Sequence, residues 1–237
     1  MNGAPLALGA VALLAVAGRS RSGVVSSWDA MRLDPGPALV TPEGVVGLRQ
    51  IGRGMFSTIY QRIDPGDEHG MVYAVVMRGV WDKHIAAEAH GYLPDNPHLP
   101  AVETLGALVD GRSVHRMPFY RTPYRSRDAK PEDARAFKII QACADEVRAV
   151  RGQTGFDTMN RVISCIEERG GVPPDLLEAI EVLAAIAPEH AKAYDMEFTP
   201  RNAATDYEGN LVLLDLLFDR NALRRRRAQI SRRERGG

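Results

Sequence analysis

The sequence predicts an α+β fold in which a small antiparallel sheet with one helix is followed by a helical region. Apolar segments bounded by glycine and polar turns read as strands at 47–51, 72–78 and 105–117. Tracts with helical patterning follow at 131–150, 157–169 and 173–187, and a shorter one at 82–93 precedes them. The 237 residues, 45% of them hydrophobic, suffice for one domain or two small lobes with a hydrophobic core.

The N-terminal segment 1–23 contains an apolar run at 4–18, followed by Arg19 and Arg21. The run is shorter than the roughly 20 residues of a membrane-spanning helix. It also lacks the basic start and the clear cleavage site of a signal peptide. We leave open a membrane or partner-binding anchor, a helix packed on the protein, or disorder. If the run inserts, the arginines after it hold the body in the cytoplasm, so we expect a cytoplasmic or membrane-associated protein. Residues 24–42 read as a Ser- and Pro-containing linker.

The net charge of zero hides a basic C-terminal tail at 221–237. Seven arginines and Glu234 lie in the last fourteen residues, which therefore carry +6, and the rest of the chain carries −6. We expect this tail to be disordered or a frayed helix, with the capacity to contact a polyanion. An anionic membrane is favoured over nucleic acid, because the run at 4–18 would add hydrophobic anchoring. Cys143 and Cys165 read as buried or free thiols of a reducing compartment.

A glycine-containing turn lies between the first two strands of the body. It reads Gly52-Arg-Gly54-Met-Phe-Ser57, and glycines of this kind let backbone N–H groups approach phosphates. The strand at 72–78 ends in Arg78, which can point at the same phosphates if the strand continues to it. The helix after it carries Glu88 at its centre. A later segment, Met117-Pro-Phe-Tyr, follows the strands and precedes the longer helical tracts.

The stretch 194–218 carries the strongest chemical pattern of the chain. A polar loop at 195–202 leads into a short strand, a turn at Asp206-Tyr-Glu-Gly-Asn210, and the apolar strand 211–214, which delivers Asp215. Adjacent β segments therefore carry Asn202 and Asp215, the residue types that hold Mg²⁺ in phosphoryl transfer. Such chemistry also needs a carboxylate near the acceptor hydroxyl.

These motifs, taken in order, resemble the protein kinase-like superfamily, whose catalytic loop reads H-R-D-L-x-x-x-N. Counting back five from Asn202 gives Glu197, and Pro200 lies two before Asn202 as in the common K-P-x-N version. Asp215 follows Asn202 by the family's usual gap to the Asp of D-F-G. Asp195 stands where His is usual, Leu-Leu replaces Phe-Gly, and no lysine ends the strand at 72–78. Only 22 residues follow Asp215, so the helical lobe is truncated; reduced kinase-like proteins of tailed bacteriophages look similar.

The resemblance implies a two-lobe fold, with an N-lobe at 43–120 and a truncated helical C-lobe at 121–220. It implies ATP and Mg²⁺ as cofactors, with Asn202 and Asp215 as metal ligands and Glu197 or Asp195 as the catalytic acid. The nucleotide contacts implied are Gly52, Gly54, Ser57, Arg78, Glu88 and Met117.

Three functions remain open. The first is a phosphotransferase acting on an unknown acceptor, either a protein or a small molecule. The second is a catalytically inactive pseudokinase that serves as a binding module. The third is a membrane- or nucleic-acid-associated phage structural protein.

Overall fold

The computed structural model describes residues 15–16, 38–41, 44–62, 70–108, 110–149, 155–190 and 194–235. The chain divides into two compact units. Unit 1 comprises residues 1–78 and 104–116, and unit 2 comprises residues 79–103 and 117–237. Most of the apolar run at 4–18 and of the linker at 24–42 lies outside the described residues. Within the described ranges, no helix is long and apolar enough to cross a membrane.

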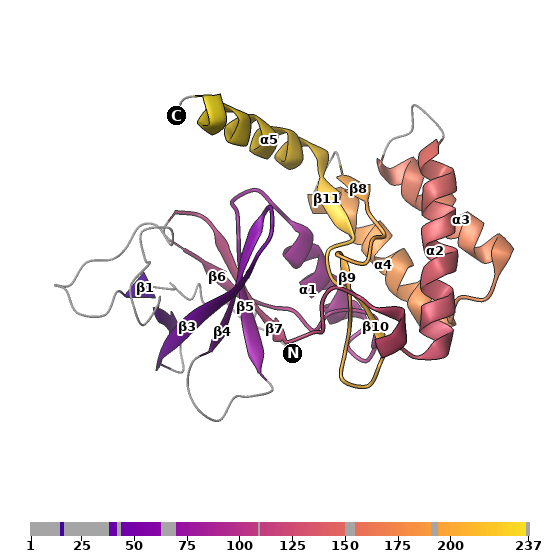
Figure 1. Cartoon of the computed structure of the whole chain (residues 1–237), viewed down its shortest axis with the longest axis horizontal. Helices are drawn as coiled ribbons and strands as arrows, with labels where there is room; N and C mark the ends of the chain where they lie inside the picture. Colours follow the sequence, from indigo (N-terminus) through magenta and orange to yellow (C-terminus); the bar gives the residue numbers. More distant parts are fainter. Residues whose placement is uncertain are drawn as a thin grey trace, which may run out of the picture. The chain divides into compact units, whose positions relative to one another are not determined.

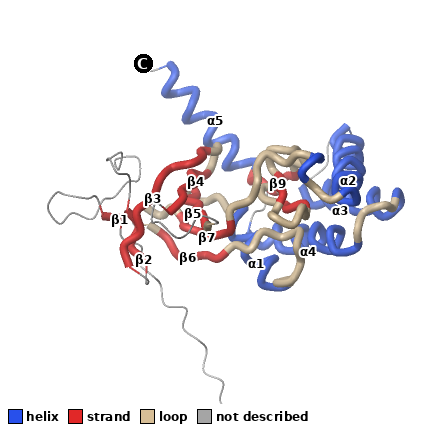
Figure 2. The backbone as a smooth tube through the Cα atoms, turned by 60° about the horizontal axis from the view of Figure 1, so that its bottom comes forward, coloured by secondary structure: helices blue, strands red, loops and turns tan. Residues whose placement is uncertain are grey.

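Unit 1 is built on a sheet, drawn in red in Figure 2, and its strands between residues 38 and 76 pair antiparallel, as the sequence predicts. Among the described residues the sheet has seven strands, in the order β1-β2-β3-β4-β5-β7-β6. The strands are β1 (Ala15–Val16), β2 (Ala38–Thr41), β3 (Gly44–Arg53), β4 (Ser57–Arg62), β5 (Met71–Val76), β6 (Glu103–Ala107) and β7 (Ser113–Pro118). A cluster that includes Leu48, Tyr60, Tyr73 and Val114 forms the core of this unit.

Unit 2 contains the helices and two short β-ribbons (Figure 1). Its helices are α1 (Asp82–Tyr92), the 3₁₀ turn η2 (Ser126–Asp128), α2 (Pro131–Ala149), α3 (Gly155–Arg169), α4 (Pro174–His190) and α5 (Arg220–Arg235). Its strands are β8 (Tyr194–Met196), β9 (Ala203–Thr205), β10 (Leu211–Leu213) and β11 (Leu217–Asp219). The predicted helical tracts are confirmed. The helix predicted in the N-lobe, α1, packs on α4 and so belongs to unit 2, which differs from the expected boundary at 43–120.

The predicted hairpin at 203–213 is confirmed, with β9 and β10 paired antiparallel from Leu211 opposite Thr205 to Leu213 opposite Ala203. Its turn is held by Asp206, whose Oδ1 accepts hydrogen bonds from the N–H groups of Glu208 (2.9 Å) and Asn210 (2.8 Å). Gly209 has φ of +86°, a conformation that side-chain-bearing residues rarely adopt. Local turn chemistry therefore fixes the register that places the segments on either side of the hairpin next to each other.

The basic tail is a continuous helix, α5, over Arg220–Arg235 rather than a disordered segment. Asp219 caps its start, because its Oδ1 accepts hydrogen bonds from the N–H groups of Asn221 (2.6 Å) and Ala222 (3.1 Å). Ala222 is buried, and most of the later residues are exposed. A capped first turn that packs on β11 and β8 starts the helix, which composition alone does not reveal.

The expectation of free thiols is wrong, because Cys143 and Cys165 form a disulfide. Cys143 lies on α2 and Cys165 on α3, with Cα atoms 5.7 Å apart, within the main hydrophobic core of unit 2. Both residues fall on helical stripes that read as core positions. Their pairing arises only because α2 packs against α3, a contact that sequence spacing does not show.

Reduction of this disulfide is expected to lower the free energy of unfolding by about 3 kcal/mol, because the bridge closes a loop between residues 22 apart in sequence. Urea unfolding with and without a reductant measures the change. The Cys143→Ser/Cys165→Ser double variant serves as the control and should not respond to reductant. A parent protein whose two thiols alkylate fully without reduction would contradict the assignment.

Candidate functional site

Unit 2 brings Asn202 and Asp215 together through the backbone. The main-chain oxygen of Asn202 accepts hydrogen bonds from the N–H groups of Leu214 (3.1 Å) and Asp215 (3.0 Å). The N–H of Asn202 itself bonds to the oxygen of Thr199 at 3.0 Å, which tightens the end of the loop. The two predicted metal ligands are therefore held side by side by main-chain hydrogen bonds, independently of their own side chains.

Glu197 belongs to the same cluster. The Nδ2 group of Asn202 donates to the main-chain oxygen of Glu197 (3.1 Å) and to its Oε2 (3.2 Å). This orientation leaves Oδ1 of Asn202 available to a cation. Glu197 is exposed, and its N–H bonds to the oxygen of Leu216 at 2.8 Å, so the residue is fixed to the segment that follows Asp215. The five-residue spacing thus corresponds to a direct contact.

Asp195 has a different environment. It lies on β8 opposite Phe218 of β11, and its Oδ2 accepts hydrogen bonds from Nε (3.0 Å) and Nη2 (2.8 Å) of Arg220. Its other oxygen accepts from the N–H of Met196 at 2.9 Å. A carboxylate in a forked contact with an arginine already has its charge compensated. Of the two candidate acids, Glu197 shares contacts with Asn202, and Asp195 joins β8 to α5.

Lys83 is a member of the site that the sequence analysis missed. Its side chain is 2% exposed, and its ammonium contacts Oδ1 of Asp215 and donates to the main-chain oxygen of Leu214 at 3.0 Å. Asp82 Oδ2 lies 3.8 Å from the same nitrogen. The sequence pattern predicts a cation at the end of the strand at 72–78, whereas Lys83 is the second residue of α1. A signal was present, since Lys83 is the only lysine among the first 129 residues.

Burial and charge shift the pKa values of this cluster in a definite direction. Burial by itself lowers the pKa of the Lys83 ammonium, but attraction to Asp215 and Asp82 outweighs it and leaves that pKa above its ordinary value. Burial raises the pKa of the Asp82 carboxyl from 3.8 to about 7, and the Asp215 charge adds to this increase while Lys83 opposes it. Asp82 Oδ1 is buried and has no hydrogen-bond partner in the described part of the chain.

The predicted glycine turn lies in unit 1, between β3 and β4. The N–H of Gly54 donates to the oxygen of Ser57 at 2.8 Å, which closes the turn. A methyl group added at Gly52 or Gly54 would meet neighbouring atoms only at 3.5 Å or more, an ordinary van der Waals distance. The fold of unit 1 therefore does not itself require glycine at these positions, and their predicted role beside phosphates stays a prediction.

The remaining predicted nucleotide contacts lie on three different elements. β5 ends at Val76, so Arg78 is not a strand residue; it is exposed in a turn, with its stem against Gly111. Glu88 is half-buried on α1, and Met117 is buried in β7. The strand face on which the role of Arg78 depended is therefore absent at that residue, and the proposed roles of all three stay predictions.

The donors at 202 and 215 fit Mg²⁺. The ion prefers oxygen ligands and is usually held by one or two carboxylates together with substrate phosphates. Asp215 is 44% exposed, and Lys83 contacts only one of its oxygens. Oδ1 of Asn202 supplies a second donor. Among the described residues no group of three or more His, Cys, Asp or Glu side chains could hold a metal alone.

No family model and no curated protein matches this chain. Comparison with solved structures finds similarity to the BubR1 kinase domain, with a TM-score of 0.34 and 13% sequence identity. The match covers 78% of this chain and 51% of that chain, so this chain spans about half the length of its solved neighbour.

Asp82→Asn is expected to alter the dependence of stability on pH. The pKa of the Asp82 carboxyl is higher in the folded than in the unfolded chain. Its contribution to the free energy of unfolding is therefore complete below pH 3.8 and is lost as the pH rises through about 7. Relative to the variant, the parent should lose about 2 kcal/mol of unfolding free energy between pH 5 and pH 8. Urea unfolding at both pH values measures this difference, and parallel curves for the two proteins would refute it.

Proposed function

We propose that the chain is a kinase-like phosphotransferase with a reduced helical lobe, dependent on ATP and Mg²⁺. One observation carries the proposal. Asn202, Asp215 and Glu197 are joined by hydrogen bonds at the end of the predicted catalytic loop, and a buried lysine contacts Asp215. An ordinary surface hairpin needs none of these side chains. A site for phosphoryl transfer needs each type: hard oxygen donors, a cation and a carboxylate.

Each residue has a proposed role. Asp215 and Asn202 would hold Mg²⁺, which would neutralise charge on the phosphate oxygens. Lys83 orients Asp215 and supplies the fixed positive charge that the sequence predicted at Arg78. Glu197 accepts the proton of the acceptor hydroxyl. The hydroxyl oxygen then bonds to the γ-phosphorus of ATP as the bond from that phosphorus to ADP breaks. Positioning supplies most of the rate in such reactions, so the main-chain contacts of Asn202 matter as much as its amide.

A second candidate, a pseudokinase that serves as a binding module, is favoured by the Lys83 contact itself. An ammonium on Oδ1 already compensates the charge of Asp215, so the loop can be stable without any metal ion. This candidate predicts nucleotide binding without turnover, or no nucleotide binding at all.

Nucleotide binding is the first test of the proposal. Saturating ATP with Mg²⁺ is expected to raise the melting temperature of the parent, by roughly 3–6 °C at ten times Kd, because the ligand stabilises the native state by mass action. Asp215→Asn should abolish the increase. Gly54→Ala, which the fold tolerates, should reduce it.

Glu208→Gln is the matched control for this experiment, since Glu208 is exposed at the turn of the hairpin and its carboxylate takes no part in the site. This variant should behave like the parent. If ATP with Mg²⁺ raised the melting temperature of the parent and of Asp215→Asn equally, Asp215 would be rejected as a metal ligand.

The two loop acids are expected to differ in their effects. Glu197→Gln should lower kcat by about 10²–10⁴-fold and leave the ATP-induced thermal shift intact, since it removes a proton acceptor. Asp195→Asn should mainly lower the melting temperature, because it breaks the contact with Arg220. ADP release and thermal melts on both variants separate the effects. The reverse ranking would make Asp195 the catalytic acid, and a parent that binds ATP without releasing ADP is a pseudokinase.

The arginines of α5 support a separate proposal, contact with a polyanion. Arg224, Arg225 and Arg227 are exposed within about one turn of a formed helix. Binding to duplex DNA should weaken steeply with salt, with a log–log slope near −0.9 for each phosphate neutralised. Replacing these three arginines by Gln should reduce that slope, as titrations at several salt concentrations would reveal. Flotation with anionic liposomes without DNA retardation would instead indicate a membrane partner.

A further inference from the structure

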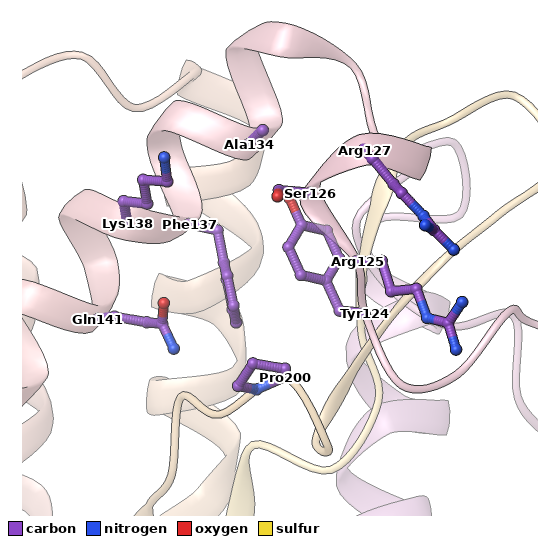
Figure 3. A pocket seen from close by; sticks show the side chains of 9 residues that line it. All are labelled: Tyr124, Arg125, Ser126, Arg127, Ala134, Phe137, Lys138, Gln141 and Pro200. Carbon is purple, nitrogen blue, oxygen red and sulfur yellow. The ribbon is translucent and has the colours of Figure 1, made fainter.

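A pocket of about 510 Å³ lies beside the predicted catalytic loop, wholly within unit 2 (Figure 3). Its size lies in the range of small-molecule sites. It is formed where η2 and the first turns of α2 meet the loop. Its lining residues are Tyr124, Arg125, Ser126, Arg127, Ala134, Phe137, Lys138, Gln141 and Pro200.

The pocket shares its wall with the predicted catalytic loop. Pro200 lies between Glu197 and Asn202, and its main-chain oxygen accepts a hydrogen bond from the N–H of Tyr124 at 2.8 Å. Gln141 donates from Nε2 to the oxygen of Phe198 at 3.1 Å. A ligand held here therefore lies against the same short loop that presents the Glu197 carboxylate.

Charge in the pocket has a single sign. Three lining residues are cations, Arg125, Arg127 and Lys138, and no lining residue is acidic. Nearby Asp128 lies 3.6 Å from Nε of Arg127, in an exposed pair that carries little energy. Asp133 on α2 is buried, with Oδ2 accepting a hydrogen bond from the N–H of Leu211. In the described part of the chain, the side chains of Arg125 and Lys138 make no ion pair, so an anion meets uncompensated positive charge.

The floor of the pocket is aromatic. The rings of Tyr124 and Phe137 lie 4.6 Å apart between centroids at an angle of 55°. Figure 3 places them between Lys138 and Gln141 on one side and the two arginines on the other, with Pro200 beyond the rings. The arginine ends turn away from Phe137 in this view, and because Arg127 is 74% exposed its rotamer can change at little cost. The Tyr124 hydroxyl is buried without a partner among the described residues, and a ligand oxygen that reached it would satisfy that donor.

We propose that this pocket binds an organic phosphate, a phosphate monoester on a planar or apolar body, and that such a compound is the phosphoryl acceptor. The assignment as acceptor rests on the proposed phosphotransferase, whereas the binding site does not. The aromatic floor takes the body of the ligand. The cations at the rim take its phosphate, with arginine offering the forked contact that phosphate oxygens accept. A hydroxyl elsewhere on the ligand then faces the loop of Glu197.

Phenyl phosphate is the probe, titrated against the full chain by ³¹P NMR without ATP or Mg²⁺. Saturable binding is expected, and Arg125→Gln or Lys138→Gln should each weaken it by about tenfold, since each removes a positive charge from the lining of the pocket. Arg135→Gln is the matched control, because Arg135 is an exposed cation on α2 outside the pocket. It should bind like the parent.

Contrary results are well defined. Absence of saturable binding, or equal weakening in all three variants, would overturn the proposal. If phenol bound as tightly as phenyl phosphate, the cations would not bind the phosphate group. If inorganic phosphate bound as tightly as phenyl phosphate, the aromatic floor would not bind the body of the ligand.

The binding measurement separates this inference from the proposed function. Asp215→Asn should bind phenyl phosphate like the parent, because Asp215 does not line the pocket. A protein that binds ATP but not phenyl phosphate overturns only the present inference, and the reverse result overturns only the proposed function. Where ATP turnover is present, an aryl phosphate bearing an alcohol should accelerate ADP release, and Arg125→Gln should raise its KM with kcat unchanged. An unchanged KM would overturn the assignment as acceptor.

Discussion

The buried ammonium of Lys83 is the constraint on which unit 2 depends most directly. A charge in a nearly dry environment is tolerated only when it is paired and hydrogen-bonded. Here the partners are the main-chain oxygen of Leu214 and the carboxylate of Asp215, with Asp82 slightly farther away. The first turn of α1 is thereby tied to the segment that follows β10. The position and charge of Asp215 follow from this contact, whether or not the protein is an enzyme.

Several acids of unit 2 contact groups that belong to the fold itself. Asp133, Asp206 and Asp219 each accept hydrogen bonds from backbone N–H groups, and Asp195 binds Arg220. These carboxylates satisfy groups that the fold would otherwise bury or leave unpaired. Glu197 contacts the side chain of Asn202 and is otherwise open to solvent. This contact with a predicted metal ligand, together with its exposure, makes Glu197 a candidate for chemistry.

The same cluster is compatible with catalysis and with a binding role, and the reason is electrostatic. Lys83 compensates one oxygen of Asp215, which stabilises the loop without a ligand, and the Asp215 side chain stays 44% exposed. Under the proposed function, Mg²⁺ that arrives with phosphates would use the Asp215 carboxylate and Oδ1 of Asn202. A protein that has lost turnover can keep the identical contacts for stability alone. The pocket beside Pro200 adds positive charge that the fold does not use. Among the described residues, Arg125 and Lys138 make no ion pair, and Arg127 makes only an exposed one with Asp128.

The sequence by itself determined the elements whose causes are local. Helical stripes predicted α2, α3 and α4, and the Asp206–Asn210 turn with Gly209 predicted the β9–β10 hairpin, because periodicity and turn chemistry depend on neighbours along the chain. The hairpin also fixed the spacing that brings Asn202 to Asp215. Tertiary structure alone decided the rest. Lys83 contacts Asp215 across 132 positions of sequence. Cys143 pairs with Cys165 where α2 packs on α3. Asp195 differs from Glu197 in that Arg220, on α5, binds its carboxylate. Each of these contacts depends on how elements pack, and no local pattern encodes which side chains packing will bring together.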